Sequence, residues 1–123
     1  MARSGDVPPS ASQSRSARQP REQLEEAEGL RQQGKLDRAE AICYPLVRRH
    51  PGYVAALHTL GLVYLDKGDF ERALDCLVRA SMLDPANWMT LTALSLAYLR
   101  LGASEMAAQT LDKALAIRPR DAS

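Results

Sequence analysis

Two histidines and two cysteines are the residues of this 123-residue chain that could hold a metal ion or act in nucleophilic chemistry. They are His50, His58, Cys43 and Cys76. A structural zinc site brings four such ligands together, usually in pairs a few residues apart. No cluster here has that spacing, and two cysteines do not make a disulfide framework. We therefore predict no metal site, and we expect Cys43 and Cys76 to be small buried hydrophobic residues.

Four glutamates near the start of the chain are the other group with potential chemistry, because neighbouring carboxylates can act as general acid and base. They are Glu22, Glu25, Glu26 and Glu28. Their spacing instead favours one charged, solvated helix face. No glycine-rich phosphate loop accompanies them. The sequence therefore predicts no catalytic residue, no cofactor and no enzyme activity.

Composition and charge narrow the fold class, the partners and the location. Hydrophobic residues make up 46% of the chain and aromatic residues 5%, which favours packed helices over sheets. The net charge of +1 creates no strong field, so we expect neither nucleic acid nor a membrane surface as a partner. No apolar run approaches the ~20 residues that cross a bilayer, and the N-terminus lacks the apolar core of a signal peptide. A cytoplasmic location is the expectation.

An internal repeat of 34 residues organises the chain. Three residue types recur at this period: Gly34, Gly68 and Gly102; Ala39, Ala73 and Ala107; Pro51, Pro85 and Pro119. Such a period is the sequence signature of solenoid architectures. We therefore predict repeats over residues 20–53, 54–87 and 88–121, with a C-terminal remnant at 122–123. Residues 1–19 hold almost nothing to bury, so we predict a disordered tail there, with a basic docking arm as the alternative.

Each repeat has the pattern of two helices joined by a glycine turn. In the second repeat, apolar or small residues recur on one helix face, namely Leu57, Leu60, Gly61 and Tyr64. Gly68 is expected in the left-handed conformation that ends a helix, and Asp69 is placed to cap the next one. Pro85 ends the unit, because the residue before a proline avoids the helical region. Gly61 is expected to be small because the two helices approach closely there.

These residues make the chain resemble the tetratricopeptide repeat family over residues 20–121. The second repeat carries the signature at Leu60, Gly61, Tyr64, Ala73, Leu77, Ala80 and Pro85, and the third at Leu91, Leu94, Ser95, Tyr98, Ala107, Leu111, Ala114 and Pro119. The resemblance implies an all-α fold, a right-handed superhelical solenoid of three antiparallel helix pairs. Gln23 and Glu26 depart from the apolar pattern, which suits a terminal helix with one wet face. Pro45, inside the second helix of the first repeat, predicts a kink.

The resemblance also implies a concave groove lined by the first helix of each pair. Its positions in this sequence are Leu24, Glu28, Arg31, Ala55, His58, Leu62, Leu65, Asp66, Asn87, Met89, Thr92, Leu96, Leu99 and Arg100. The middle of this set is apolar, and soluble proteins rarely leave such a patch in water without use. We interpret it as a groove for an apolar segment of a partner protein, extended or helical. The alternative is packing of these residues against a neighbouring helix or against the kinked first repeat.

One subset of the family binds the terminal carboxylate of a chaperone tail with Lys, Asn and Arg side chains. The matching positions here hold Leu24, Glu28, Thr59, Met89 and Ala93. Because the charged clamp is absent, the resemblance does not extend to that ligand.

The final helix, expected over residues 104–117, presents apolar residues that no later helix pair of this sequence covers. They are Leu111, Ala114, Leu115 and Ile117. Leaving a large aliphatic side chain in water forfeits roughly 1.5–3 kcal/mol. Two alternatives follow: a second copy of the chain covers this face in a homodimer, or the natural protein continues. A third option, the tail folding back over the face, is less favoured by the composition of the tail.

The sequence as a whole predicts a binding module of a bacterial-type cytoplasm, a scaffold that holds a protein or peptide partner. A second hypothesis is the N-terminal repeat segment of a larger bacterial glycosyltransferase or sulfotransferase. A third, by analogy of fold alone, is a secretion-system chaperone.

Overall fold

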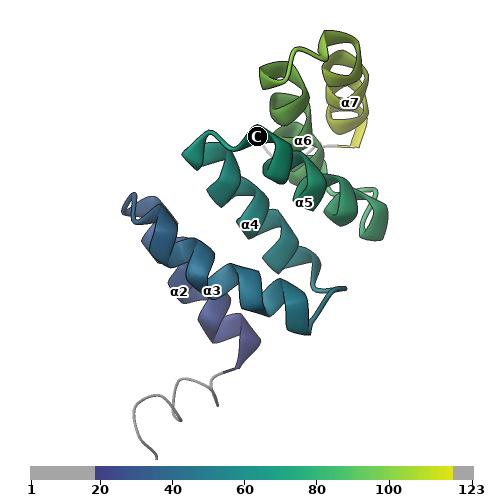
Figure 1. Cartoon of the computed structure of the whole chain (residues 1–123). Helices are drawn as coiled ribbons and strands as arrows, with labels where there is room; N and C mark the ends of the chain where they lie inside the picture. Colours follow the sequence, from purple (N-terminus) through teal and green to yellow (C-terminus); the bar gives the residue numbers. More distant parts are fainter. Residues whose placement is uncertain (1–18, 118–123) are drawn as a thin grey trace, which may run out of the picture.

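The computed structural model describes residues 19–117, which form six α-helices and no strand. The helices are α2 (Pro20–Gln32), α3 (Leu36–Arg49), α4 (Val54–Lys67), α5 (Phe70–Leu83), α6 (Trp88–Arg100) and α7 (Ser104–Ile117). Successive helices run antiparallel and pack as three pairs, which follow one another from α2–α3 to α6–α7 (Figure 1). The predicted all-α solenoid of three helix pairs is confirmed.

The same glycine turn joins the two helices of every pair. Gly34, Gly68 and Gly102 have φ angles of 80°, 83° and 84°, a left-handed conformation that strains any residue with a Cβ atom. After α4, the N–H of Asp69 donates to the carbonyl of Tyr64 at 2.9 Å, which satisfies an end group of the helix. The corresponding bonds after α2 and α6 are also 2.9 Å long. The left-handed turn predicted at Gly68 is confirmed, and it recurs in each pair.

Side-chain caps fix where two of the helices begin. The carboxylate of Asp69 accepts a hydrogen bond from the N–H of Arg72 at 3.3 Å, as predicted. At the start of α6, the side-chain oxygen of Asn87 accepts from the N–H groups of Met89 and Thr90, at 3.1 and 3.3 Å. Both caps supply acceptors to helix N–H groups that have no partner within the helix.

The core runs between the pairs and includes the predicted face of α4. Leu57, Leu60 and Tyr64 are all buried. A Cβ atom on Gly61 would lie 2.7 Å from two atoms of Leu77, which confirms that α4 and α5 approach closely there. α3 continues from Leu36 to Arg49 through Pro45, so the proline does not end the helix, and a kink stays a prediction.

The predicted repeat boundaries can be compared with the helix starts. The first helix of each pair begins at Pro20, Val54 or Trp88, the first residue of each predicted repeat. The predicted tail, apart from Gln19, and residues 118–123 lie outside the described residues. Among the helices of residues 19–117, none is both long and apolar enough to cross a bilayer.

Candidate binding groove

A groove of about 1070 Å³ runs along the first helices of the three pairs and onto α7. Nine of the fourteen residues that the sequence placed on the concave side line it. They are Leu24, Glu28, His58, Leu62, Leu65, Met89, Thr92, Leu96 and Leu99. The lining therefore comes from α2, α4 and α6, in the order of the repeats.

The other five predicted residues, Arg31, Ala55, Asp66, Asn87 and Arg100, are not part of this lining. Arg31 forms ion pairs with Glu28 at 2.7 Å and with Asp66 at 2.9 Å, so it ties α2 to α4. Asn87 caps α6, and the guanidinium of Arg100 lies 6.0 Å from the centre of the Phe70 ring. Arg31, Asp66 and Arg100 thus interact with other side chains, and Asn87 interacts with the backbone at the start of α6.

The groove lining also contains nine residues that the concave-side pattern did not include. They are Arg21, Glu25, Thr59, Ala93, Ser95, Ser104, Ala107, Ala108 and Leu111. The last four belong to α7, the second helix of its pair. α7 reaches the groove because no further pair stands beside it within residues 19–117. Leu111 is among the apolar residues of α7 that no later helix pair of this sequence covers. That observation could have indicated that α7 contributes to the groove.

Charge in the lining is confined to one end of the groove. Arg21, Glu25 and Glu28, all on α2, are its only charged side chains apart from the titratable His58. The hydrogen bonds from Arg31 hold the pKa of Glu28 below its usual value, so this carboxylate is ionised at neutral pH. The walls formed by α4, α6 and α7 carry apolar and small polar side chains.

His58 faces the groove from α4 as a half-buried neutral side chain. Its Nδ1 lies 3.1 Å from the hydroxyl oxygen of Thr90 on α6. Burial lowers the pKa of His58. The charge of Glu28 raises this pKa and the charge of Arg31 lowers it, and both effects are smaller than that of burial. The imidazole is therefore uncharged at pH 7 and acts as a hydrogen-bonding link between the second and third pairs.

Exposure of the apolar lining increases toward α6. Leu62 and Leu65 on α4 are half-buried. Leu96, Leu99 and Met89 on α6 are 40%, 56% and 51% exposed. The strongest apolar contact available to a ligand therefore lies at the end of the groove opposite the charged residues of α2.

The four residues expected on an oligomer face separate into two groups. Ala114 is 1% exposed and packs inside the last pair. Leu111, Leu115 and Ile117 are 40%, 51% and 38% exposed. A homodimer through this face stays a prediction, carried by these three side chains.

The cysteines lie in the core, as expected from the sequence. Burial raises the pKa of the Cys43 thiol to about 12 and that of Cys76 to about 11, so both are protonated at neutral pH. A protonated, buried thiol is a poor nucleophile and metal ligand. Across residues 19–117, no three His, Cys, Asp or Glu side chains are grouped so that they could hold a metal ion.

Comparison with known sequences identifies the repeat. The tetratricopeptide repeat family model matches residues 24–75 and 58–122, which together span most of the chain. The chain belongs to the tetratricopeptide repeat family. A search of curated proteins gave no match.

Solved structures with similar folds include proteins of different function. The second TPR of Spaghetti (RPAP3), bound to the HSP90 peptide SRMEEVD, has a TM-score of 0.78 and 18% identity over 87% of this chain and 99% of that one. A mutant Thermobaculum terrenum O-GlcNAc transferase has a TM-score of 0.78 and 27% identity over 83% of this chain and 20% of that one. MamA from Desulfovibrio magneticus RS-1 has a TM-score of 0.74 and 20% identity over 82% of this chain and 57% of that one.

The coverage differs between these structures. The chain spans nearly the whole of the Spaghetti domain, about a fifth of the transferase chain and a little over half of MamA. The tetratricopeptide repeat fold of this chain is consistent with a protein-interaction scaffold.

Proposed function

We propose that this chain binds an apolar segment of a partner protein in the concave groove. The observation that carries the proposal is the continuous apolar lining, in which Leu62, Leu96 and Leu99 follow one another across α4 and α6. Leucines 40% and 56% exposed on the wall of a groove would lose water contact when a ligand binds. A ligand that covers several of them has an expected dissociation constant of ~1 μM, or about −8 kcal/mol.

The charges of the groove favour a ligand that is not acidic. The peptide bound by the Spaghetti domain, SRMEEVD, carries three acidic side chains and one basic one. The groove of this chain presents one cation, Arg21, against the carboxylates of Glu25 and Glu28. Arg31 is already paired with two acids. A ligand of this chain is therefore apolar where it meets α6, and neutral or basic where it meets α2.

The test is partner capture by two matched double variants. Leu62→Asp with Leu96→Asp places two charges on the groove wall and should abolish capture from a native lysate. Leu83→Asp with Leu101→Asp changes two leucines that are also partly exposed, at 51% and 39%, but lie outside the lining. This control should capture the same partner as the unchanged chain.

Two readouts make this result decisive. Circular dichroism should show the same helix content in both double variants. A synthetic segment of the captured protein should then bind the unchanged chain, and not the groove variant, in fluorescence anisotropy. Equal capture by the two variants would show that the groove does not hold the partner.

A second candidate function is that of a repeat segment in a larger glycosyltransferase. The observation in its favour is the similarity to the O-GlcNAc transferase structure, whose chain is matched over 20% of its length at 27% identity. In that case the repeats would position substrates for a catalytic domain elsewhere. Reading the coding sequence after Ser123 tests the idea, and a stop codon directly after that residue would remove it. A cytoplasmic, bacterial setting stays a prediction under either function.

A further inference from the structure

A second hollow, of about 560 Å³, lies between the first and second helix pairs. Its two walls are α3 and α5, which do not pack directly against each other, and its floor is α4, which lies between them (Figure 1). Leu60 and Tyr64 of this floor lie on the opposite side of α4 from Leu62, which lines the groove. The α3–α5 hollow shares no lining residue with the groove, so it is a separate surface.

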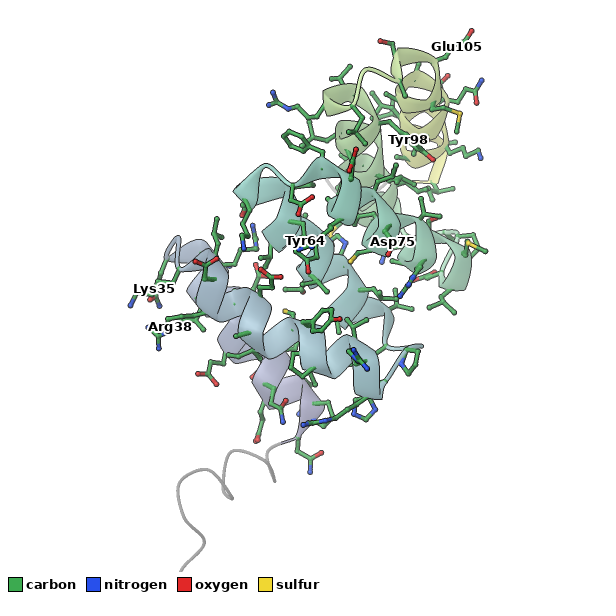
Figure 2. The ribbon with its side chains drawn as sticks, in the orientation of Figure 1. Lys35, Arg38, Tyr64, Asp75, Tyr98 and Glu105 are labelled. Carbon is green, nitrogen blue, oxygen red and sulfur yellow. The ribbon has the colours of Figure 1, made fainter. Side chains whose placement is uncertain are left out.

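Apolar side chains form the floor of the α3–α5 hollow, and arginines stand on both of its walls. Tyr64, which Figure 2 shows on α4 between α3 and α5, lies at the floor together with Leu60. Arg48 on α3 and both Arg72 and Arg79 on α5 line the walls, and all three are exposed. A guanidinium group holds a carboxylate through two parallel hydrogen bonds. The walls therefore suit an anion, and the floor suits an apolar side chain.

Two carboxylates also line the α3–α5 hollow, and both already have partners in the chain. Glu40 accepts hydrogen bonds from Lys67 at 2.6 Å and from the hydroxyl of Tyr64 at 2.9 Å. The bond from Lys67 holds the pKa of Glu40 below its usual value, so this carboxylate is ionised at neutral pH. Asp75 lies 3.6 Å from Arg79 in an exposed ion pair, and such pairs are weak. An incoming carboxylate can therefore compete with Asp75 for Arg79.

Arg48 has no carboxylate partner among residues 19–117. Its guanidinium donates to the hydroxyl of Tyr44 at 3.4 Å and lies 5.8 Å from the centre of the same ring. These contacts hold the side chain against α3 without neutralising its charge. Arg48 is thus a positioned cation that is available to an anion from outside.

The next junction, between the second and third pairs, shows which lining residues the repeat itself requires. Leu60 and Tyr64 recur 34 residues later as Leu94 and Tyr98. The three arginines do not recur, because the corresponding residues are Met82, Met106 and Lys113. Arginines that served only the solenoid fold would be expected at both junctions. The arginines on both walls are therefore a property of this one hollow.

We propose that the α3–α5 hollow binds an acidic segment of a partner protein. An apolar side chain of the segment lies against Leu60 and Tyr64, and carboxylates on either side of it are held by Arg48 and Arg79. This site goes beyond the groove function proposed above and does not depend on it. Its ligand is acidic, whereas the ligand expected in the groove is neutral or basic.

The charge of the lining favours a short acidic segment over nucleic acid. The lining holds three arginines and two carboxylates, which leaves one net positive charge. Proteins bind nucleic acid mainly by neutralising several phosphates at once. A few carboxylates around one apolar side chain match both the small charge and the apolar floor.

The probe is a fluorescein-labelled peptide with one leucine between two pairs of glutamates. It is titrated with the 123-residue chain and followed by anisotropy. Saturable binding is expected, and it should weaken as the NaCl concentration is raised because salt screens exposed charges. Matched peptides with glutamine for glutamate, or with glycine for leucine, should bind at least fivefold more weakly. The first lacks the charges, and the second lacks the apolar contact.

Charge changes in the chain separate the α3–α5 hollow from the overall charge. Arg48→Glu should weaken binding about fivefold, and Arg48→Gln about twofold. Arg49→Glu makes the same change in net charge one residue further along α3, at an exposed side chain outside the lining, and should leave binding nearly unchanged. Asp75→Asn removes the carboxylate beside Arg79 and should strengthen binding about threefold. A loss of structure would not produce that gain.

Two further measurements complete the test. Circular dichroism should show the same helix content in all these variants, because each changed side chain is exposed. Leu62→Asp, on the wall of the groove, should leave binding of the glutamate peptide unchanged. The two sites can therefore fail independently of each other.

Three results would overturn the proposal. One is the absence of saturable binding of the glutamate peptide. Another is equal weakening by Arg48→Glu and Arg49→Glu at unchanged helix content, because the net charge of the chain, and not the hollow, would then hold the peptide. The third is tighter binding of a uridine oligonucleotide of the same charge that Arg48→Glu abolishes, because the occupant would then be a nucleic acid.

Discussion

Gly61→Ala provides the sharpest test of how closely α4 and α5 approach. The new Cβ atom would lie 2.7 Å from both Cγ and Cδ2 of Leu77. Carbon atoms in favourable contact are about 3.5–4.0 Å apart. Leu77 is 0% exposed, so its side chain has no solvent-filled space to move into. The substitution therefore overpacks the core, at a cost of about 1–3 kcal/mol.

Helix propensity opposes this cost. Replacing a helical glycine by alanine gains about 1 kcal/mol because the unfolded chain loses conformational freedom. The net change in the free energy of unfolding at Gly61 is therefore a loss of about 0–2 kcal/mol. Gly29→Ala is the matched control, since nothing lies within 4 Å of a Cβ atom at Gly29 in α2. It should stabilise the chain by about 1 kcal/mol.

Urea unfolding followed by circular dichroism measures the difference. For a domain of this size the slope is about 1–3 kcal/mol/M, so the two midpoints should differ by roughly 1 M, with Gly29→Ala the higher. The first repeat offers a compensating pair, because Ala27 and Cys43 stand where the second repeat has Gly61 and Leu77. Gly61→Ala should therefore cost less in a Leu77→Cys background. Equal stabilisation by the two single alanine variants would refute the close approach.

Two further predictions concern polar groups between the helices. Burial holds the pKa of His58 below its usual 6.5, so the unfolded chain binds more protons than the folded chain. The free energy of unfolding should therefore fall as the pH decreases below about 6.5. The urea midpoints at pH 7.5 and 5.5 should differ less in His58→Gln than in the unchanged chain. Tyr64→Phe removes the hydroxyl that donates to Glu40 at 2.9 Å, and should lower the free energy of unfolding by about 1 kcal/mol in the same assay. An unchanged midpoint would mean that water replaces this bond at no cost.

The period of the sequence predicts the fold well because glycine and proline act locally. A left-handed turn at Gly34, Gly68 and Gly102 depends on the residue type alone, so the turns and the helices between them follow from the spacing. The apolar wall of the groove follows as well, because the side-chain direction repeats with the helix period.

The choice of partners by long polar side chains could not be predicted in the same way. Arg31 and Asp66 occupy concave-side positions, yet they pair with each other at 2.9 Å instead of lining the groove. Asn87 caps α6 because its side chain reaches two N–H groups of the first turn. Each outcome depends on the distance between elements after packing.

The two ends of the described solenoid differ in the type of side chain that they carry at equivalent positions. At the α2 end, Gln23 and Glu26 stand where interior helices carry leucines. At the α7 end, Leu111 keeps the residue type of its buried counterpart Leu77. A leucine left about half exposed forfeits about 1 kcal/mol, so Leu111 and Leu115 together weaken this end by about 2 kcal/mol unless something covers them. Polar residues would remove that penalty, as they do at the other end. The two ends therefore differ in residue type at equivalent positions, and Leu111 connects the exposed apolar side of α7 to the groove beside it.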